Sequence, residues 1–295
     1  MQIGSTEFKI GTRTFIVGIL NVTPDSFFDG GEYTEVEKAV NRAKKLASDG
    51  ADIIEIGGES SRPGFTPVDA QTEMARILPV LKAVKQELNI PIAIDTYKAV
   101  VAEAALQNGA ALINDVFGFK KDPEHPNVCA KYNAACCVMH NRDDTNYKSV
   151  LIDIATDLQE SIEALINAGV DPQKIIIDPG IGFAKDAEQS IHVLRNLSYF
   201  TAFAQPVMLG ASRKSFIGHS IGLDVEDRLE ATIATTVLAI QQKCAFIRVH
   251  DVKENKRAAM MTDKLVRNYF NPSREAQCRG NGAGFTPAER GGLGA

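Results

Sequence analysis

The residues best suited to chemistry in this sequence follow short apolar runs, at the point where each run ends. In chain order they are Asn21, Glu59, Asp95, Asn114, Asp115, His140, Asp178, Lys214, Arg248 and His250. In a parallel α/β barrel the loops after the strands build the active site, so polar residues just past each run face one pocket. Caps and turns alone do not require acids, amides and cations that converge in this way. The pattern therefore predicts an active site.

Four of these side chains suit a flat heterocycle. Asp95 and Asp178 accept hydrogen bonds when ionised, Asn114 both donates and accepts, and Lys214 donates with a positive charge. A carboxylate accepts two parallel hydrogen bonds from a planar group with adjacent N–H donors, and a pterin or guanine ring presents such an edge. Asn114 alone is weak support, because an asparagine after a strand usually forms a turn. Asp178 is stronger, because it follows three isoleucines and precedes a rigid Pro-Gly turn.

Basic residues at three further places indicate anion binding. Arg62 lies in the loop after the second run, Arg248 and His250 end the last run, and residues 212–215 lead into the seventh helical region. Free backbone N–H groups at the start of a helix favour a carboxylate or a phosphate. A single arginine is most often a solvated surface residue, so the inference depends on all three places. Together they indicate a doubly anionic ligand or two anionic ligands.

The first loop, residues 21–31, is longer than a plain connection requires. It contains a proline and paired glycines, which indicate specified turns. Its carboxylates Asp25 and Asp29, together with Asn21, could hold Mg²⁺ on a phosphate. Loops that close over a barrel mouth often have such a composition, and the alternative is an ordinary flexible connection.

The elements that position these residues alternate regularly along the chain. The expected strands are 15–20, 52–56, 92–94, 112–113, 135–139, 175–177, 207–209 and 246–249. The expected helices are 36–48, 71–88, 99–108, 152–168, 187–203, 225–242 and 252–269, with a poorly marked fourth helix near 126–131. Continuously apolar strands are typical of a parallel sheet covered on both faces. The even repeat favours a (β/α)8 TIM barrel over an open doubly wound sheet.

The chain has 295 residues, of which 44% are hydrophobic and 23% charged, and this suits one large core because α/β barrels run to about 250 residues as one domain. The net charge is −5 without a basic stretch, which argues against nucleic acid as a partner. No apolar run is long enough for a membrane span. Residues 1–13 lack the apolar centre of a signal peptide, so we expect a cytoplasmic protein.

Two further features affect the domain plan. The five cysteines include no CxxC pair, and the adjacent Cys136 and Cys137 are interpreted as buried thiols on opposite faces of a strand. Residues 271–295 are rich in glycine and poor in large apolar residues. Such a composition cannot bury a core, so we expect a disordered tail after a catalytic domain of residues 1–270.

Eight ordered stretches closely resemble dihydropteroate synthase, a pterin-binding enzyme family of the folate pathway. They are GILNVTPDSFFDGG (18–31), ADIIEIGGESSRPG (51–64), PIAIDTY (91–97), ALINDVFG (111–118), VMH (138–140), IIIDPGIGF (175–183), LGASRKSFIG (209–218) and FIRVHDV (246–252). The resemblance covers about residues 8–270 and leaves out the tail. It implies condensation of 6-hydroxymethyl-7,8-dihydropterin pyrophosphate with 4-aminobenzoate, which gives 7,8-dihydropteroate and pyrophosphate.

The resemblance also implies roles for individual residues. The pterin would be held by Asp95, Asn114, Asp178, Lys214 and Arg248. The pyrophosphate would be held by Thr23, Ser61, Arg62, Arg248 and His250, with Mg²⁺ ligated by Asn21. The aminobenzoate would be held by Pro63, Phe183, Lys214 and Ser215. A homodimer through the last helices is implied as well, and residues 232–240 are apolar enough to allow one.

A mechanism follows from this chemistry, with Asp29, Lys214 and Arg248 as its catalytic residues. Pyrophosphate is a good leaving group once Mg²⁺, arginine and histidine neutralise its developing charge. Its SN1-like departure leaves a cation at the exocyclic methylene, which we hypothesise that Asp29 stabilises. The arylamine is neutral at pH 7 and attacks without a deprotonating residue.

The sequence departs from the family pattern in both loops, and two rival functions remain open. Phe28 stands where a small polar residue is common, Phe65 follows the Pro-Gly of the second loop, and Ser61 replaces the usual threonine. The two aromatic residues could alter discrimination between aminobenzoate and sulfonamides. A pterin-dependent methyltransferase would not need the anion-binding loops. A catalytically silent pterin-binding barrel would be expected to lack Asn21, Lys214 or Arg248.

Overall fold

The computed structural model describes residues 1–23, 32–59 and 66–267, and eight parallel strands form its main sheet. The strands are β3 (Phe15–Asn21), β4 (Ile53–Gly57), β5 (Ile92–Asp95), β6 (Leu112–Asp115), β7 (Ala135–Met139), β8 (Ile175–Asp178), β9 (Met208–Leu209) and β10 (Phe246–Val249). Their spatial order is β8-β7-β6-β5-β4-β3-β10-β9. The sheet closes where Ile177 pairs with Val207 and donates its N–H to the Pro206 carbonyl at 3.0 Å. The predicted (β/α)8 barrel is confirmed.

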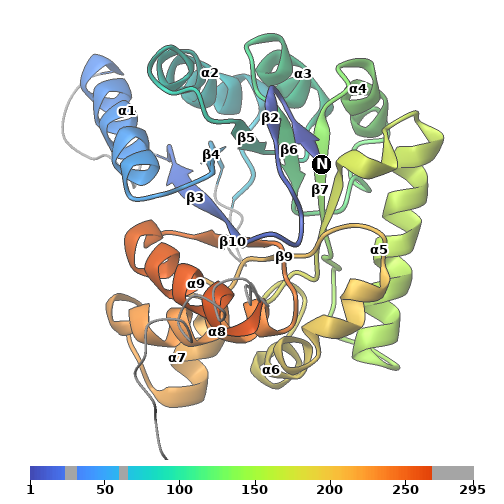
Figure 1. The fold of residues 1–295 in the computed structure, drawn as a ribbon. Helices are drawn as coiled ribbons and strands as arrows, with labels where there is room; N and C mark the ends of the chain where they lie inside the picture. Colours follow the sequence, from blue (N-terminus) through green and yellow to red (C-terminus); the bar gives the residue numbers. More distant parts are fainter. Residues whose placement is uncertain (24–31, 60–65, 268–295) are drawn as a thin grey trace, which may run out of the picture.

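Figure 1 shows the helices as a ring around the strands. They are α1 (Glu32–Ser48), α2 (Ala70–Glu87), α3 (Ala99–Gln107), α4 (His125–Lys131), α5 (Val150–Asn167), α6 (Ala187–Arg195), α7 (Ser215–Ile221), α8 (Leu229–Gln241) and α9 (Val252–Val266). The helix expected over 187–203 is shorter, because Asn196 bonds back three residues to Val193 and the chain continues as the 3-10 helix Leu197–Ala202. The seventh helical region consists of α7 and α8.

A short antiparallel hairpin closes the amino-terminal end of the barrel. It is formed by β1 (Gln2–Ile3) and β2 (Thr6–Glu7), which are too short for the sequence pattern to predict. The chain after it places Phe8 against Phe15 and Phe246, with ring centroids 5.0 and 5.9 Å away. This aromatic plug leaves the opposite end of the barrel interior for polar residues.

Side chains within each strand alternate between two apolar layers. In β4, Ile53 belongs to the barrel interior, whereas Ile54 packs in the layer between the sheet and the helices. Cys136 and Cys137 divide in the same way, so the prediction that they face opposite sides of a strand is confirmed. The strands are apolar without alternation only near their amino ends. Farther along β3, β4, β5, β6, β8 and β10, an inward position becomes polar, and this change in chemistry builds the site.

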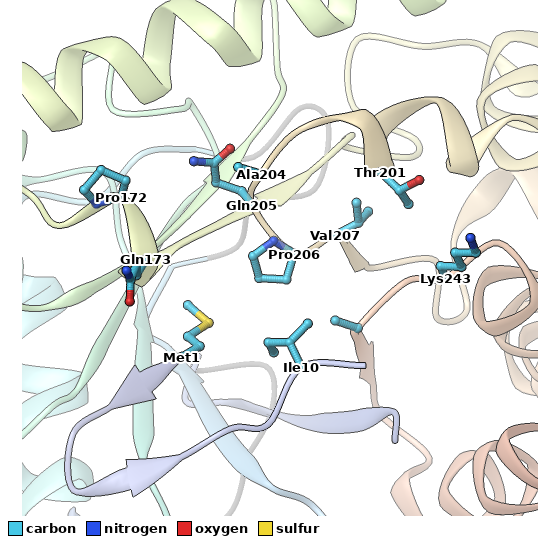
Figure 2. A pocket seen from close by; sticks show the side chains of 11 residues that line it. Met1, Ile10, Pro172, Gln173, Thr201, Ala204, Gln205, Pro206, Val207 and Lys243 are labelled. Atoms are coloured by element: carbon cyan, nitrogen blue, oxygen red, sulfur yellow. The ribbon is translucent and has the colours of Figure 1, made fainter. Parts of the chain in front are cut away.

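A hollow at the amino-terminal end of the barrel lies away from the chemistry (Figure 2). Its lining includes Met1, Ile10, Pro172, Pro206 and Val207, and it contains none of the described residues with a predicted ligand role. Val207 comes directly before β9, so this hollow is at the opposite end from the strand ends that carry the acids and amides.

No helix in residues 1–23, 32–59 and 66–267 is both long enough and apolar enough to cross a membrane. The cysteines in this part of the chain are all buried free thiols.

Candidate active site

Asp95 and Asn114 lie side by side because β5 and β6 pair in parallel with these two residues opposite each other. Nδ2 of Asn114 donates to Oδ1 of Asp95 at 2.9 Å. The side chain of Asn114 is fully buried, and its Oδ1 atom has no hydrogen-bond partner within the described structure. Since buried polar atoms are nearly always paired, this oxygen is an acceptor that awaits a ligand donor.

Asp178 ends β8 and completes the acceptor set. Its Oδ1 atom accepts the Gly180 N–H at 2.8 Å, within the Pro-Gly turn that follows the strand. Its Oδ2 atom lies 3.2 Å from Nη2 of Arg248. The carboxylate is thus fixed in one orientation, and each oxygen retains a further lone pair for a ligand.

Arg248 occupies an inward position of β10, and its guanidinium lies inside the barrel. Nη1 of Arg248 is 3.5 Å from Oε1 of Glu55, whereas Nη2 is the nitrogen that contacts Asp178. Gly210 makes room for this group, because a Cβ atom there would lie 2.7 Å from Nη2. Burial raises the pKa of Glu55, and the two carboxylates hold the pKa of Arg248 above its usual value. Sequence reasoning missed Glu55, because it considered only the strand ends.

Lys214 and Phe183 form the wall beside this acceptor set. The Lys214 ammonium donates to the Ile181 carbonyl and lies 4.4 Å from the centroid of the Phe183 ring. Burial, aided by the positive charge of Arg248, lowers the pKa of Lys214 to about 7. Burial and the Glu55 carboxylate raise the pKa of Asp95 to about 8. The chamber therefore holds acids and bases that are close to exchanging protons at neutral pH.

Of the residues after β9 and β10 that were predicted to bind anions, some lie together and one is paired with a carboxylate. His250 and Ser212 lie together, with Nδ1 of His250 3.0 Å from the serine hydroxyl. Arg213 instead forms a bidentate pair with Asp251, at 2.8 Å through Nε and 2.8 Å through Nη2. Because Asp251 neutralises its charge, Arg213 adds little to an anion site. Ser215 is exposed and begins α7.

The expected Mg²⁺ ligand Asn21 ends β3 and is exposed at the barrel mouth, and Thr23 follows it half-buried. A Cβ atom at Gly57 would lie 3.5 Å from Oδ1 of Asn21 and 3.9 Å from Oδ2 of Asp95, so both oxygens border one space. Such hard oxygen donors fit Mg²⁺. The described residues contain no group of three or more His, Cys, Asp or Glu side chains placed to hold a metal. Water and phosphate would have to complete the coordination.

Three of the strand-end residues have structural partners instead. Asp115 points outward to Nδ1 of His125 at 2.9 Å, and Glu59 pairs with Lys98. The ring of His140 lies between Asp157 and Lys185 and is buried, which lowers its pKa to about 3. The prediction from position that these three side chains face the pocket is therefore wrong, because buried or half-buried partners hold each of them elsewhere. The ligand roles that the resemblance implies did not include them.

Several predicted residues lie outside the described residues. They are Asp25, Phe28 and Asp29 of the first loop, and Ser61, Arg62, Pro63 and Phe65 of the second. The expected domain limit at residue 270 and the tail 271–295 also lie outside them.

Comparison with known proteins identifies the family to which this geometry belongs. The family model described as "Pterin binding enzyme" matches residues 17–250. A dihydropteroate synthase of Clostridium beijerinckii is 53% identical over 268 residues, which are 90% of this chain and 100% of the relative. The chain belongs to the dihydropteroate synthase family. The predicted family and enzyme class are confirmed, and neither the methyltransferase nor the silent barrel is favoured.

Solved dihydropteroate synthases share the fold. The structure from Clostridium difficile in the presence of pteroic acid has a TM-score of 0.87 and 50% identity, and the match covers 89% of this chain and 100% of that one. The structure from Xanthomonas albilineans with 4-aminobenzoic acid has a TM-score of 0.82 and 37% identity, with 86% and 93% covered.

Proposed function

We propose that this chain condenses 6-hydroxymethyl-7,8-dihydropterin pyrophosphate with 4-aminobenzoate, giving 7,8-dihydropteroate and pyrophosphate for folate synthesis. The observation that carries the proposal is the buried, unpartnered Oδ1 of Asn114, which the described residues leave open beside Asp95. An acceptor in this environment selects a ligand that presents a hydrogen-bond donor, such as a ring or exocyclic N–H group, because a ligand without one leaves it unpaired. The Clostridium difficile relative was solved in the presence of pteroic acid, which supports a pterin compound as the ligand.

The edge of the pterin ring is bound by side chains that match its hydrogen-bond donors and acceptors. Asp178 and Asn114 accept from the ring's adjacent N–H groups, and Asp95, which accepts Nδ2 of Asn114 at 2.9 Å, lies beside the same edge. Lys214 donates to the ring carbonyl and the neighbouring nitrogen. Arg248 covers the ring face, because its guanidinium already lies beside Asp178 at 3.2 Å. These contacts orient the exocyclic methylene toward the barrel mouth.

The leaving group lies over the ends of β3 and β10. Thr23 and His250 hold the phosphates, Arg248 reaches them from the ring, and Ser212 positions the His250 ring at 3.0 Å. Asn21 would hold Mg²⁺, which when bound supplies positive charge for the pyrophosphate oxygens. Ser61 and Arg62 have the same role in the second loop by family resemblance. Asp29 would face the cation that forms as pyrophosphate leaves.

The aminobenzoate lies between the pterin and the wall formed by Phe183 and Lys214. The Lys214 ammonium lies over the Phe183 ring, so a carboxylate at this point meets a cation while the benzene ring meets an aromatic face. Ser215 at the start of α7 belongs to this subsite, and the family resemblance assigns Pro63 of the second loop to it as well. The amine attacks as a neutral group, and its proton leaves to solvent after the C–N bond forms. Phe28 and Phe65 would tune discrimination against sulfonamides.

Two wider proposals accompany the activity. A homodimer is supported by α9, which exposes Met260, Met261 and Leu265 at 60%, 59% and 72% of their surfaces. A cytoplasmic location is supported by the free thiols of the described cysteines, which suit a reducing compartment.

The activity is tested by pyrophosphate release from the two substrates with Mg²⁺. We expect release that requires both substrates, is abolished by a chelator and is inhibited by a sulfonamide. Lys214→Met should lower kcat/KM by about 100-fold, since it removes a charged hydrogen-bond donor at both substrates. Lys174→Met, on a half-buried lysine that donates to the Asn133 carbonyl at 2.8 Å, is the matched control. Methyl transfer from a methylated pterin without pyrophosphate release would contradict the proposal.

A further inference from the structure

A second buried lysine lies behind the aminobenzoate wall. Only 8% of the surface of Lys185 is exposed. Its ammonium is within hydrogen-bond distance of three acceptors, which are Nδ1 of His140 at 2.8 Å, the Gly180 carbonyl at 3.0 Å and the Phe183 carbonyl at 3.0 Å. An ammonium has three donors, so the charged lysine satisfies all three acceptors at once.

The acceptor role of His140 is fixed by its other neighbours. Nε2 of His140 is 3.0 Å from Oδ2 of Asp157, and the same oxygen accepts Nε of Arg142 at 2.8 Å. Burial keeps the imidazole neutral, so it donates from Nε2 to the carboxylate and accepts at Nδ1 from Lys185. This chain of contacts connects the lysine to α5 and to the loop before it.

The segment 180–183 has little regular structure of its own to hold it. Gly180 and Gly182 have φ values of 69° and 76°, and a Cβ atom on Gly180 would lie 2.0 Å from the His140 carbonyl oxygen. In this conformation the carbonyls of residues 180 and 183 turn to Lys185, while the Ile181 carbonyl turns to Lys214. The segment is therefore held between two lysine ammonium groups.

We propose that Lys185 is a positioning residue, which sets the aminobenzoate subsite by holding the Phe183 backbone so that its ring lies beneath Lys214. The inference rests on the proposed function. The pterin end depends less on this clamp. Asp178 does accept the Gly180 N–H at 2.8 Å, but β8 and Arg248 at 3.2 Å also hold it. Loss of the clamp should therefore weaken aminobenzoate binding far more than pterin binding.

The main test is Lys185→Met, which keeps the length of the side chain and removes its donors. We expect the KM for 4-aminobenzoate to rise about tenfold, as for the loss of a charged hydrogen bond, while kcat and the KM for the pterin substrate change less than threefold. Lys174→Met serves as the control, because it removes a lysine-to-carbonyl bond near the start of β8, away from the mouth. An unchanged KM for aminobenzoate, or an equal rise for both substrates, would overturn the inference.

Two substitutions of His140 provide a second test if Lys185→Met does not fold. His140→Gln keeps an acceptor for the lysine and should leave the KM for aminobenzoate within threefold of wild type, whereas His140→Leu removes the acceptor and should raise it. Equal effects of the two substitutions would overturn the inference. Amide hydrogen exchange of residues 180–183 separates the two proposals. Faster exchange in Lys185→Met, with a wild type that forms no dihydropteroate, would uphold the clamp and reject the proposed function.

Discussion

The side chain of Asn114 donates to Oδ1 of Asp95 at 2.9 Å, and its own oxygen is buried without a hydrogen-bond partner in the described structure. An unpaired buried acceptor costs about 1–3 kcal/mol, so the free protein is less stable at the place where a ligand would bind. A pterin N–H would satisfy the oxygen and recover that free energy. Affinity and folding stability are therefore opposed at this residue.

Asn114→Leu tests this opposition. Leucine has a similar shape and removes the unpaired oxygen, but it also removes the Nδ2 group that donates to Asp95 at 2.9 Å. These effects oppose each other, so the free energy of unfolding should stay within about 1 kcal/mol of wild type. The KM for the pterin substrate should rise at least tenfold, because one edge contact is lost. Denaturant unfolding and steady-state kinetics measure the two effects. Asn127→Leu, on the exposed face of α4, is the matched control, and equal losses of stability and affinity in Asn114→Leu would speak against a ligand-facing role.

Asp95 gives a pH dependence of stability. The folded pKa is about 8 against an ordinary value of 3.8, so the folded protein keeps a proton that the unfolded chain has released between these values. The free energy of unfolding should therefore fall as pH rises toward 8 and become level above it. Asp95→Asn removes this loss and should be more stable than wild type by about 1–3 kcal/mol at pH 8, with a smaller difference at pH 5. Asp143→Asn, on an exposed carboxylate, is the control, and an Asp95→Asn difference equal at both pH values would exclude this explanation.

The buried pair of Glu55 and Arg248 gives a test of coupling. Arg248→Met leaves two carboxylates without their cation and should cost about 3–5 kcal/mol of stability, since breaking a buried pair leaves an uncompensated charge. Adding Glu55→Gln to this variant should recover about 1–2 kcal/mol, because one of those charges is removed. Chemical denaturation of the four proteins of this double-mutant cycle measures the coupling. Strictly additive losses would show that the two side chains do not interact.

Gly210 is predicted to tolerate no side chain while Arg248 is present. A methyl group there would lie 2.7 Å from Nη2 of Arg248, so Gly210→Ala should displace the guanidinium. The expected cost is about 1–3 kcal/mol of stability from overpacking, with a fall of at least tenfold in kcat/KM. In the Arg248→Met background the same substitution should add little loss of stability, because the clash is gone. A full additional loss in that background would place the clash elsewhere.

Much of the fold follows from periodic signals that are local in the sequence. The strand ends placed Asp95, Asn114 and Asp178 correctly because an apolar run that stops at a polar residue marks the carboxyl end of a buried strand. Glu55 was missed because it lies inside such a run. The available signal was its spacing of two from Ile53, which places it inward, combined with the need of a buried acid for a cation such as Arg248.

Other contacts could not be read from the sequence. Lys185 lies only seven residues after Asp178, but its partner His140 directly follows another strand, β7, so only the folded barrel brings them together. The ion pair of Arg213 and Asp251 likewise forms only when the barrel folds. The two-residue strands of the amino-terminal hairpin are too short to show alternation, and only the glycine at residue 4, with its φ of 57°, marks the turn.

The central claim is that the unpaired Oδ1 of Asn114 accepts a hydrogen bond from the edge of a pterin ring. A crystal structure of the protein with pteroic acid bound measures this directly. We predict a ring or exocyclic nitrogen about 2.7–3.2 Å from Oδ1 of Asn114, with Asp178 on the same edge and Lys214 at the ring carbonyl. A pterin ring bound elsewhere, with Oδ1 of Asn114 still unpaired, would contradict the account.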